Sequence, residues 1–165
     1  MKNLFSFTFI ALLLFSCNDQ IEFNSPAVQG NKDGSLWRAE FYAADIDFGG
    51  FLVEGGINLE RVQLVTVTDT RGTFPLGGDA PNRALFKNSQ GVVYSTANNP
   101  DESLSLYPAI GEIIVEDISN TTPKTMSGTF WFYAYTSDGL NTVNFSQGVF
   151  HEIPLIGGLE EFPND

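Results

Sequence analysis

Short apolar or alternating segments, separated by turn residues, run through most of the chain after its first 35 residues. Eight segments have this character: 36–44, 50–54, 59–68, 83–87, 91–96, 111–118, 125–136 and 142–151. The breaks between them, such as Gly55-Gly56, Gly77-Gly78-Asp79 and Ser137-Asp138-Gly139, are rich in residues that tolerate the positive φ angles of turns. This pattern predicts one all-β domain, an antiparallel β-sandwich or flattened barrel of about eight strands with little or no helix.

The clearest alternation lies within 129–135. Side chains alternate across a strand, so Phe130 and Phe132 share one face while Trp131, Tyr133 and Tyr135 share the other. A turn then leads into a second alternating segment, and we expect a hairpin over 125–151. After Gly148 the apolar positions change phase, which indicates a bulge. The predicted core residues are Phe130, Phe132, Val115, Leu64, Val143 and Phe145.

The first 16 residues have a different character. Lys2 precedes a twelve-residue apolar run, and Ser16 stands before Cys17, the only cysteine. A membrane-spanning helix needs about 20 apolar residues, so this run is too short to span and is typical of a secretory signal. A small residue followed by cysteine favours a lipoprotein signal, because an ordinary signal peptide would leave Cys17 as a free thiol in a secreted protein.

The resulting domain organisation has four parts. We predict a lipoprotein signal peptide over 1–16, a lipidated Cys17 with a flexible tether over 17–33, the β-domain over 34–153 and a fraying C-terminal tail over 154–165. The lipid, palmitate among its acyl chains, would anchor the protein to the cell outer membrane. The sequence leaves open whether the domain faces the periplasm or the cell surface.

Charge excludes one class of partner. The 165 residues carry a net charge of −12, and the chain without residues 1–16 has 7 basic and 20 acidic residues. Such a chain is repelled by phosphate backbones, which argues against nucleic-acid binding. The expected membrane contact is therefore through lipid on Cys17.

Few residues suggest catalysis. A Ser–His–Asp arrangement would need His151, the only histidine, with Ser127 or Ser146, and neither serine lies in a nucleophile-elbow motif. One histidine and one cysteine also argue against a zinc site, and we expect no cofactor. Calcium could use Asp45-Ile46-Asp47 or Gly77-Gly78-Asp79, but neither fits the twelve-residue loop pattern, and turn capping is the favoured interpretation.

Carboxylate pairs could in principle hydrolyse a glycosidic bond. The candidates are Asp45 with Asp47, and Glu112, Glu116 and Asp117 on one predicted strand. Glu112 and Glu116 would lie about 13 Å apart on an ideal strand. Glycosidases hold their two carboxyl groups about 5–9.5 Å apart. We therefore expect no enzyme, although carboxylates from different strands leave this alternative open.

Trp131, Tyr133 and Tyr135 are the candidate ligand-binding residues. An exposed row of aromatic rings could stack on sugar rings or on another protein, because these rings combine large contact area with a polar tip. A buried row would instead be the second face of a central sandwich strand. Burial is the favoured interpretation, and the exposed row is the alternative that would make these residues a ligand site.

Several segments, in this order, carry a resemblance to a known family: Gly34-Ser35-Leu36-Trp37-Arg38-Ala39, Gly72-Thr73-Phe74-Pro75-Leu76, 111–117, 126–132 and Gly148-Val149-Phe150. With the lipid-attachment cysteine, they make the chain resemble small lipoproteins of unknown function from Bacteroidota-type bacteria. Residues 79–109 show no match. The resemblance implies an all-β domain and no catalytic residues. We therefore predict a membrane-anchored envelope lipoprotein with a non-catalytic binding or structural domain, whose partner is a glycan or an envelope protein; the alternative is a carboxylate-dependent glycan hydrolase.

Overall fold

The computed structural model of the chain describes residues 27–46, 49–77, 80–98, 100 and 110–163. This part of the chain is all-β, as predicted, with one 3₁₀ turn at Thr96–Asn98. Eleven strands, rather than about eight, make up the fold: β1 Ala27–Lys32, β2 Ser35–Arg38, β3 Phe41–Asp45, β4 Leu52–Ile57, β5 Glu60–Val65, β6 Gly72–Leu76, β7 Arg83–Lys87, β8 Val93–Ser95, β9 Gly111–Ile118, β10 Thr125–Tyr135 and β11 Thr142–Pro154. No helix in this part of the chain is long and apolar enough to cross a membrane.

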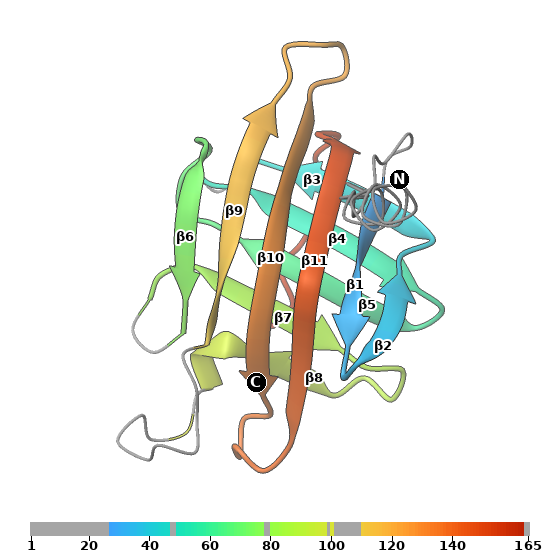
Figure 1. Ribbon diagram of the computed structural model, residues 1–165, viewed down its shortest axis with the longest axis vertical. Helices are drawn as coiled ribbons and strands as arrows, with labels where there is room; N and C mark the ends of the chain where they lie inside the picture. Colours follow the sequence, from blue (N-terminus) through green and yellow to red (C-terminus); the bar gives the residue numbers. More distant parts are fainter. Residues whose placement is uncertain (1–26, 47–48, 78–79, 99, 101–109, 164–165) are drawn as a thin grey trace, which may run out of the picture.

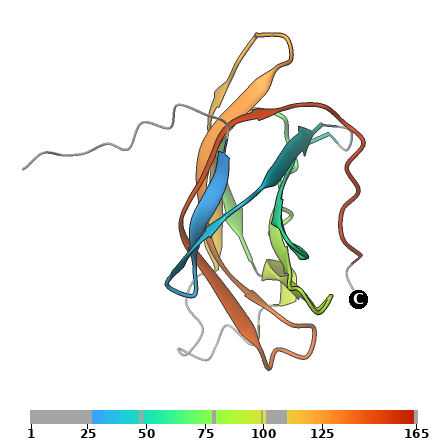
Figure 2. The ribbon, with the colours of Figure 1, turned by 90° about the vertical axis from the view of Figure 1, so that its right-hand side faces the viewer.

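The strands form one curled antiparallel sheet whose two halves face each other. The first layer has the order β2-β1-β11-β10-β9-β6, and the second has the order β8-β7-β5-β4-β3. The layers join where Tyr135 of β10 pairs with Ser95 of β8. Figure 1 shows the first layer in front, with the strands of the second layer crossing behind it, and Figure 2 shows the two layers from the side. The architecture is therefore a half-barrel with a sandwich-like core.

The core lies between the two layers. Strand alternation sends every second side chain inward. All six predicted core residues are buried there, with Trp37, Val62, Phe86 and Phe150 among their neighbours. At its centre the rings of Phe132 and Phe145, both fully buried, stack with their centroids 5.0 Å apart. The sequence prediction of the core is confirmed.

Two bulges bend β11. Phe130 pairs with Gly148 but Phe132 pairs with Phe145, so β11 contains one extra residue in this interval. A second extra residue lies between Phe150 and Ile153. The bulge residues Gln147 and Glu152 have φ angles of 50° and 49°. Such bulges increase the local twist of a strand, which helps the sheet to curl. The bulge predicted beside Gly148 is confirmed.

Strand β1 lies within the segment that we expected to be a tether. Residues 27–32 pair with both β11 and β2, so the prediction of a flexible tether up to residue 33 is wrong for this part. Val28 is buried in the core, and Gly30 lies so close to β11 that an added Cβ would be 3.1 Å from the Cα of Gly148. Only two of these six residues are apolar, which is why the alternation in the sequence was too weak to reveal the strand.

Three other strand assignments differ from the prediction. The break expected at Gly55-Gly56 lies inside β4, and the chain turns at Asn58 and Leu59 instead. The segment 36–44 forms two strands, because the chain leaves the first layer after Arg38 and enters the second at Phe41. Strand β6 was not among the eight predicted segments. It contains Pro75 and pairs only with β9, so it is an edge strand, where proline is tolerated.

The C-terminal strap, residues 155–163, packs against the domain, so the prediction that the tail frays is wrong for these residues. The chain crosses over from β11 and descends along the outside of the second layer (Figure 2). The side-chain amide of Gln63, on the outer face of β5, donates to the Glu160 carbonyl at 2.8 Å and accepts from the Phe162 N–H at 2.9 Å. Gln63 and Leu85 are completely buried on this face. The strap thus serves as an outer cover of the second layer.

Candidate functional site

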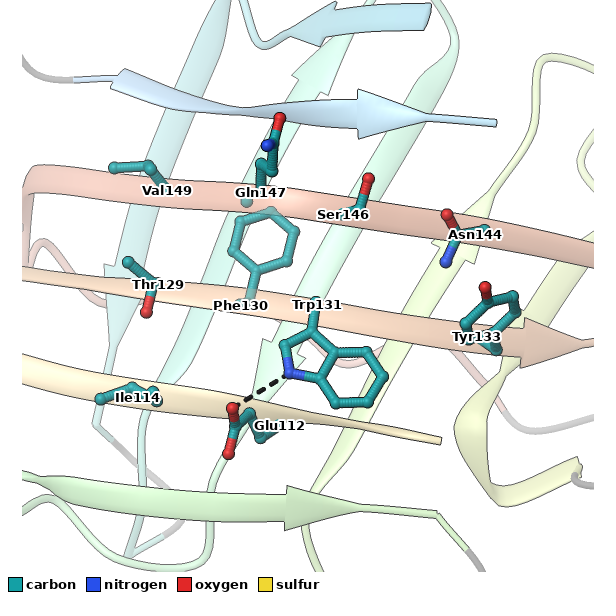
Figure 3. A pocket seen from close by; sticks show the side chains of 11 residues that line it. Glu112, Ile114, Thr129, Phe130, Trp131, Tyr133, Asn144, Ser146, Gln147 and Val149 are labelled. Atoms are coloured by element: carbon teal, nitrogen blue, oxygen red, sulfur yellow. Dashed lines mark hydrogen bonds between the residues drawn. The ribbon is translucent and has the colours of Figure 1, made fainter. Parts of the chain in front are cut away.

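The outer face of the first layer contains a groove with a volume of about 500 Å³. It lies over the middle of β9, β10 and β11, and we call it the outer-face groove. Its lining residues are Glu112, Ile114, Thr129, Phe130, Trp131, Tyr133, Asn144, Ser146, Gln147, Gly148 and Val149. Figure 3 shows the Trp131 indole toward β9, with Asn144, Ser146 and Gln147 along β11.

Trp131 and Glu112 form the β9 side of the groove. They are directly opposite each other in the antiparallel pairing of β10 and β9. The indole Nε1 of Trp131 donates a hydrogen bond to Oε1 of Glu112 at 3.0 Å. The bond restrains the orientation of a partly exposed ring. A held aromatic ring can bind a ligand with a small loss of conformational entropy.

The bulge in β11 shapes the other side of the groove. Trp131 lies between Phe130 and Phe132, whose partners on β11 are separated by the extra residue. Gln147, at the bulge, is exposed and its Oε1 accepts a hydrogen bond from Asn31 Nδ2 at 2.7 Å. Asn144 Nδ2 donates to the carbonyl of Phe132 at 3.2 Å. Two amide side chains are therefore held in fixed orientations across the groove from Trp131.

The floor of the groove depends on a glycine. Phe130 pairs with Gly148, and its ring occupies the space that a side chain at 148 would need. A Cβ on Gly148 would lie 2.5 Å from both the Phe130 carbonyl oxygen and its ring carbon Cε2. Gly148 therefore allows β10 and β11 to approach each other beneath the groove.

The predicted aromatic row is divided by the structure. Trp131 and Tyr133 are partly exposed and both line the groove. Tyr135 is only 1% exposed and lies where β10 pairs with β8, outside the lining. The inclusion of Tyr135 in an exposed ligand site is therefore wrong. At Tyr135 the sheet passes into its second layer through the pairing of β10 with β8.

The charge of the groove is negative. Among its described lining residues, Glu112 is the one carboxylic acid, and no lysine, arginine or histidine is present. The other polar side chains are the hydroxyls of Thr129, Tyr133 and Ser146 and the amides of Asn144 and Gln147. This donor set is suited to hydrogen bonding with uncharged polar groups.

The other candidate catalytic residues do not converge on the groove. Ser146 lines it, but His151 lies further along β11, at the pairing with Ala27 of β1. The hydroxyl oxygen of Ser127 accepts a hydrogen bond from the backbone N–H of Glu152 at 2.8 Å. His151 Nε2 lies 4.0 Å from Glu152 Oε2. Glu152 was not among the predicted triad residues.

The candidate carboxylates have separate structural partners. Asp45 accepts hydrogen bonds from the N–H groups of Ile46, at 2.6 Å, and Leu159, at 2.9 Å, so it holds the strap. Asp117 forms an exposed ion pair with Arg71. Glu116 is exposed at a register shift in β9. Within the described ranges, no three or more His, Cys, Asp or Glu residues gather as a metal site.

Cys17, Asp47, Gly78 and Asp79 lie outside the described residues. The lipid attachment and the turn-capping role of these aspartates accordingly stay predictions.

A second hollow, of about 310 Å³, lies where the two layers open at one end. Two of its charged groups, Lys32 and Glu60, already bind each other. Lys32 Nζ lies 2.5 Å from Glu60 Oε1, and the Trp37 indole donates to Glu60 Oε2 at 2.9 Å. Lys32 also lies over the ring of the buried Phe86, 5.0 Å from its centroid. These contacts close the end of the core, whereas the outer-face groove offers an aromatic surface.

Sequence reasoning found Trp131, Tyr133 and Glu112, but not their association. Glu112 was considered as a hydrolase carboxylate, whereas the structure makes it the partner of Trp131. Asn144 and Gln147 were not predicted as site residues. The alternation placed Asn144 opposite the core-facing Val143 and Phe145, which was the available signal. The position of Gln147 depends on the bulge.

Comparison with known proteins identifies a family. The model of a family described as "Domain of unknown function (DUF6252)" matches residues 24–154. This range contains all eleven strands and ends at the last residue of β11. No curated protein and no solved structure matches the chain. The expectation that the chain resembles a family of unknown function is confirmed.

Proposed function

Because the chain belongs to the DUF6252 family, whose function is unknown, we propose its function from its own residues. The protein is an envelope lipoprotein, anchored in the outer membrane through lipid on Cys17. Its β-domain is a non-catalytic glycan-binding module that uses the outer-face groove.

The signal sequence supports the anchor. A basic start, a twelve-residue apolar run and Ser16 precede Cys17. The motif-based resemblance to Bacteroidota-type lipoproteins supports the same proposal. Strand β1 begins at Ala27, ten residues after Cys17. A fully extended chain covers at most about 3.5 Å per residue, so the anchor and the domain can be up to about 35 Å apart.

The single observation that carries the binding role is the Trp131–Glu112 pair beside the β11 bulge. A partly exposed indole, held by a carboxylate through its N–H, leaves its ring available for stacking. The apolar faces of sugar rings pack on such an aromatic surface, while their hydroxyls need nearby polar partners. Asn144, Ser146 and Gln147 supply these partners on the facing strand.

The hollow shape of the groove favours a glycan over a partner protein. A stable protein interface buries about 800 Å² on each partner and concentrates apolar and aromatic side chains at its centre. The outer-face groove instead has a hollow of about 500 Å³ with amides and hydroxyls beside the rings. Small-molecule sites commonly combine these features.

The groove also favours binding over hydrolysis. Glycosidases need two carboxyl groups on either side of the scissile bond. Among the described lining residues, the groove has Glu112 alone, and one of its oxygens is held by Trp131. The hydrolase alternative would need a second carboxylate that this lining does not contain.

Tryptophan fluorescence provides the test. The chain has two tryptophans, Trp37 in the core and Trp131 in the groove. In the full chain carrying Trp37→Phe, Trp131 is the sole tryptophan, and its emission should change when envelope oligosaccharides from a glycan array bind. The matched variant Trp131→Phe retains the buried Trp37, and its emission should not respond.

Two results would contradict the proposal. One is the absence of any array signal and of any change in Trp131 emission across the glycans tested. The other is cleavage of a bound glycan by the purified chain, lost in Glu112→Gln, which would support the hydrolase instead. Retention of partner protein with no glycan signal would identify the groove as a protein interface.

A further inference from the structure

We propose that the outer-face groove selects neutral glycans of at least two sugar units and discriminates against anionic ones. This inference rests on the proposed glycan-binding function and adds the class of glycan. Three features of the groove carry it: its charge, its hydrogen-bonding groups and the spacing of its rings.

The first feature is the charge. Glu112 contributes a carboxylate to the lining, and none of the described lining residues is basic. The whole chain, with Glu112 included, has a net charge of −12. Phosphate, sulfate and carboxylate groups are usually recognised by arginine or lysine. An anionic sugar placed on Trp131 would instead meet Glu112 without a cation to offset the repulsion.

The second feature is the orientation of the polar groups. Trp131 occupies Oε1 of Glu112, and Asn144 donates through Nδ2 to the Phe132 carbonyl. The other oxygen of each group, Oε2 of Glu112 and Oδ1 of Asn144, can accept a hydrogen bond from a ligand. Gln147 accepts through Oε1, which leaves its Nε2 as a donor. Sugar hydroxyls both donate and accept, so they match this mixed set.

The third feature is the spacing of the rings. Trp131 and Tyr133 stand two residues apart on one face of β10, which corresponds to about 7 Å along a strand. Both line the groove. Two ring platforms in line with the strand can contact successive sugar units of a chain. A single monosaccharide would occupy only one of them.

Repulsion sets the expected selectivity. Two like charges about 4 Å apart in water repel each other enough to weaken binding about fivefold, and by more where the site excludes water. We therefore expect a neutral oligosaccharide to bind at least about fivefold more tightly than the same backbone oxidised to uronic acids. Because the effect is electrostatic, it should decrease at high salt.

The experiment compares these two ligands on the full chain carrying Trp37→Phe, with Trp131 emission as the readout. Glu112→Gln keeps an acceptor for the indole but removes the charge. The ratio of the affinity for the neutral ligand to the affinity for the anionic ligand should therefore fall toward one. Glu116→Gln removes an exposed charge from the same strand, outside the lining, and should leave the ratio unchanged. A length series should show tighter binding of the disaccharide than of the monosaccharide.

The outcomes separate the two proposals. Binding of the uronic-acid polymer as tightly as the neutral one, or more tightly, would overturn the selectivity while leaving glycan binding intact. Equal affinity for mono- and disaccharides would overturn the two-unit site. If neither ligand changes the emission and none binds on the array, the proposed function itself fails.

Discussion

Trp131 and Glu112 face each other across β10 and β9, and the indole Nε1 donates to the carboxylate Oε1 at 3.0 Å. A cross-strand pair of this kind contributes about 0.2–1 kcal/mol to the stability of a sheet. Here it also determines what the surface presents. The carboxylate holds the ring and places a negative charge at its edge, so one contact defines both the shape and the charge of the groove.

Removing this contact should cost little stability but change the environment of Trp131. We expect Glu112→Ala to lower the free energy of unfolding by about 1 kcal/mol, because a partly exposed hydrogen bond to a charged group is lost. Glu112→Gln should retain most of it. Urea unfolding and Trp131 emission in the Trp37→Phe background measure the two effects. Equal costs for Glu112→Ala and Glu116→Ala, an exposed site on the same strand, would contradict this prediction.

The aromatic centre of the core should dominate stability. Phe132 and Phe145 are both fully buried and stack at 5.0 Å. Replacing either with alanine should lower the free energy of unfolding by about 3–5 kcal/mol, because a large cavity remains. Their coupling in a double-mutant cycle should be about 0.5–1.5 kcal/mol. A coupling indistinguishable from zero would show that the two rings contribute independently.

Gly148 should tolerate no side chain. Its added Cβ would lie 2.5 Å from the backbone carbonyl of Phe130, which cannot move without breaking the β10–β11 pairing. We expect Gly148→Ala to lower the free energy of unfolding by about 2–3 kcal/mol. Gly91→Ala is the matched control: its φ of 85° is unfavourable for alanine, but its Cβ meets nothing within 4 Å. A cost for Gly148→Ala no larger than that of the control would disprove the close approach.

The strap should stabilise the second layer through Gln63. Ending the chain at Leu155 removes both hydrogen bonds that the strap makes with the Gln63 amide, and also the Glu161 partner of Arg83. We expect a loss of about 3 kcal/mol, with each net hydrogen bond contributing about 1 kcal/mol. Gln63→Ala should cost less in the truncated chain than in the full chain. If its cost in urea unfolding is the same in both, the strap does not act through Gln63.

Lipidation should depend on Cys17 alone, because the chain contains no other cysteine. Cells that express the full chain should incorporate labelled fatty acid into it, and Cys17→Ser should abolish the label and release the protein from the membrane fraction. Equal incorporation into both chains would contradict the anchor. That result would not bear on the proposal that the outer-face groove binds a glycan.

The sequence alone determined those features that depend on local periodicity. Successive side chains of a strand point to opposite faces, so the alternation within 129–135 was enough to assign Phe130 and Phe132 to the core and Trp131 and Tyr133 to the other face. The bulge beside Gly148 was also predictable, because an extra residue shifts the apolar phase within a few positions. The bounds of β7 and β9 agree with the predicted segments for the same reason.

Only the tertiary structure decided those features that depend on contacts between distant segments. Strand β1 has few apolar residues and is held by pairing with β11 and β2. Tyr135 alternates with the core face as Trp131 does, yet it is buried where β10 joins the second layer through β8. The strap is ordered through Gln63, about 100 residues earlier in the chain. The periodicity of a strand predicts which face of the sheet a side chain occupies. Whether that face is buried or exposed depends on how the sheet curls.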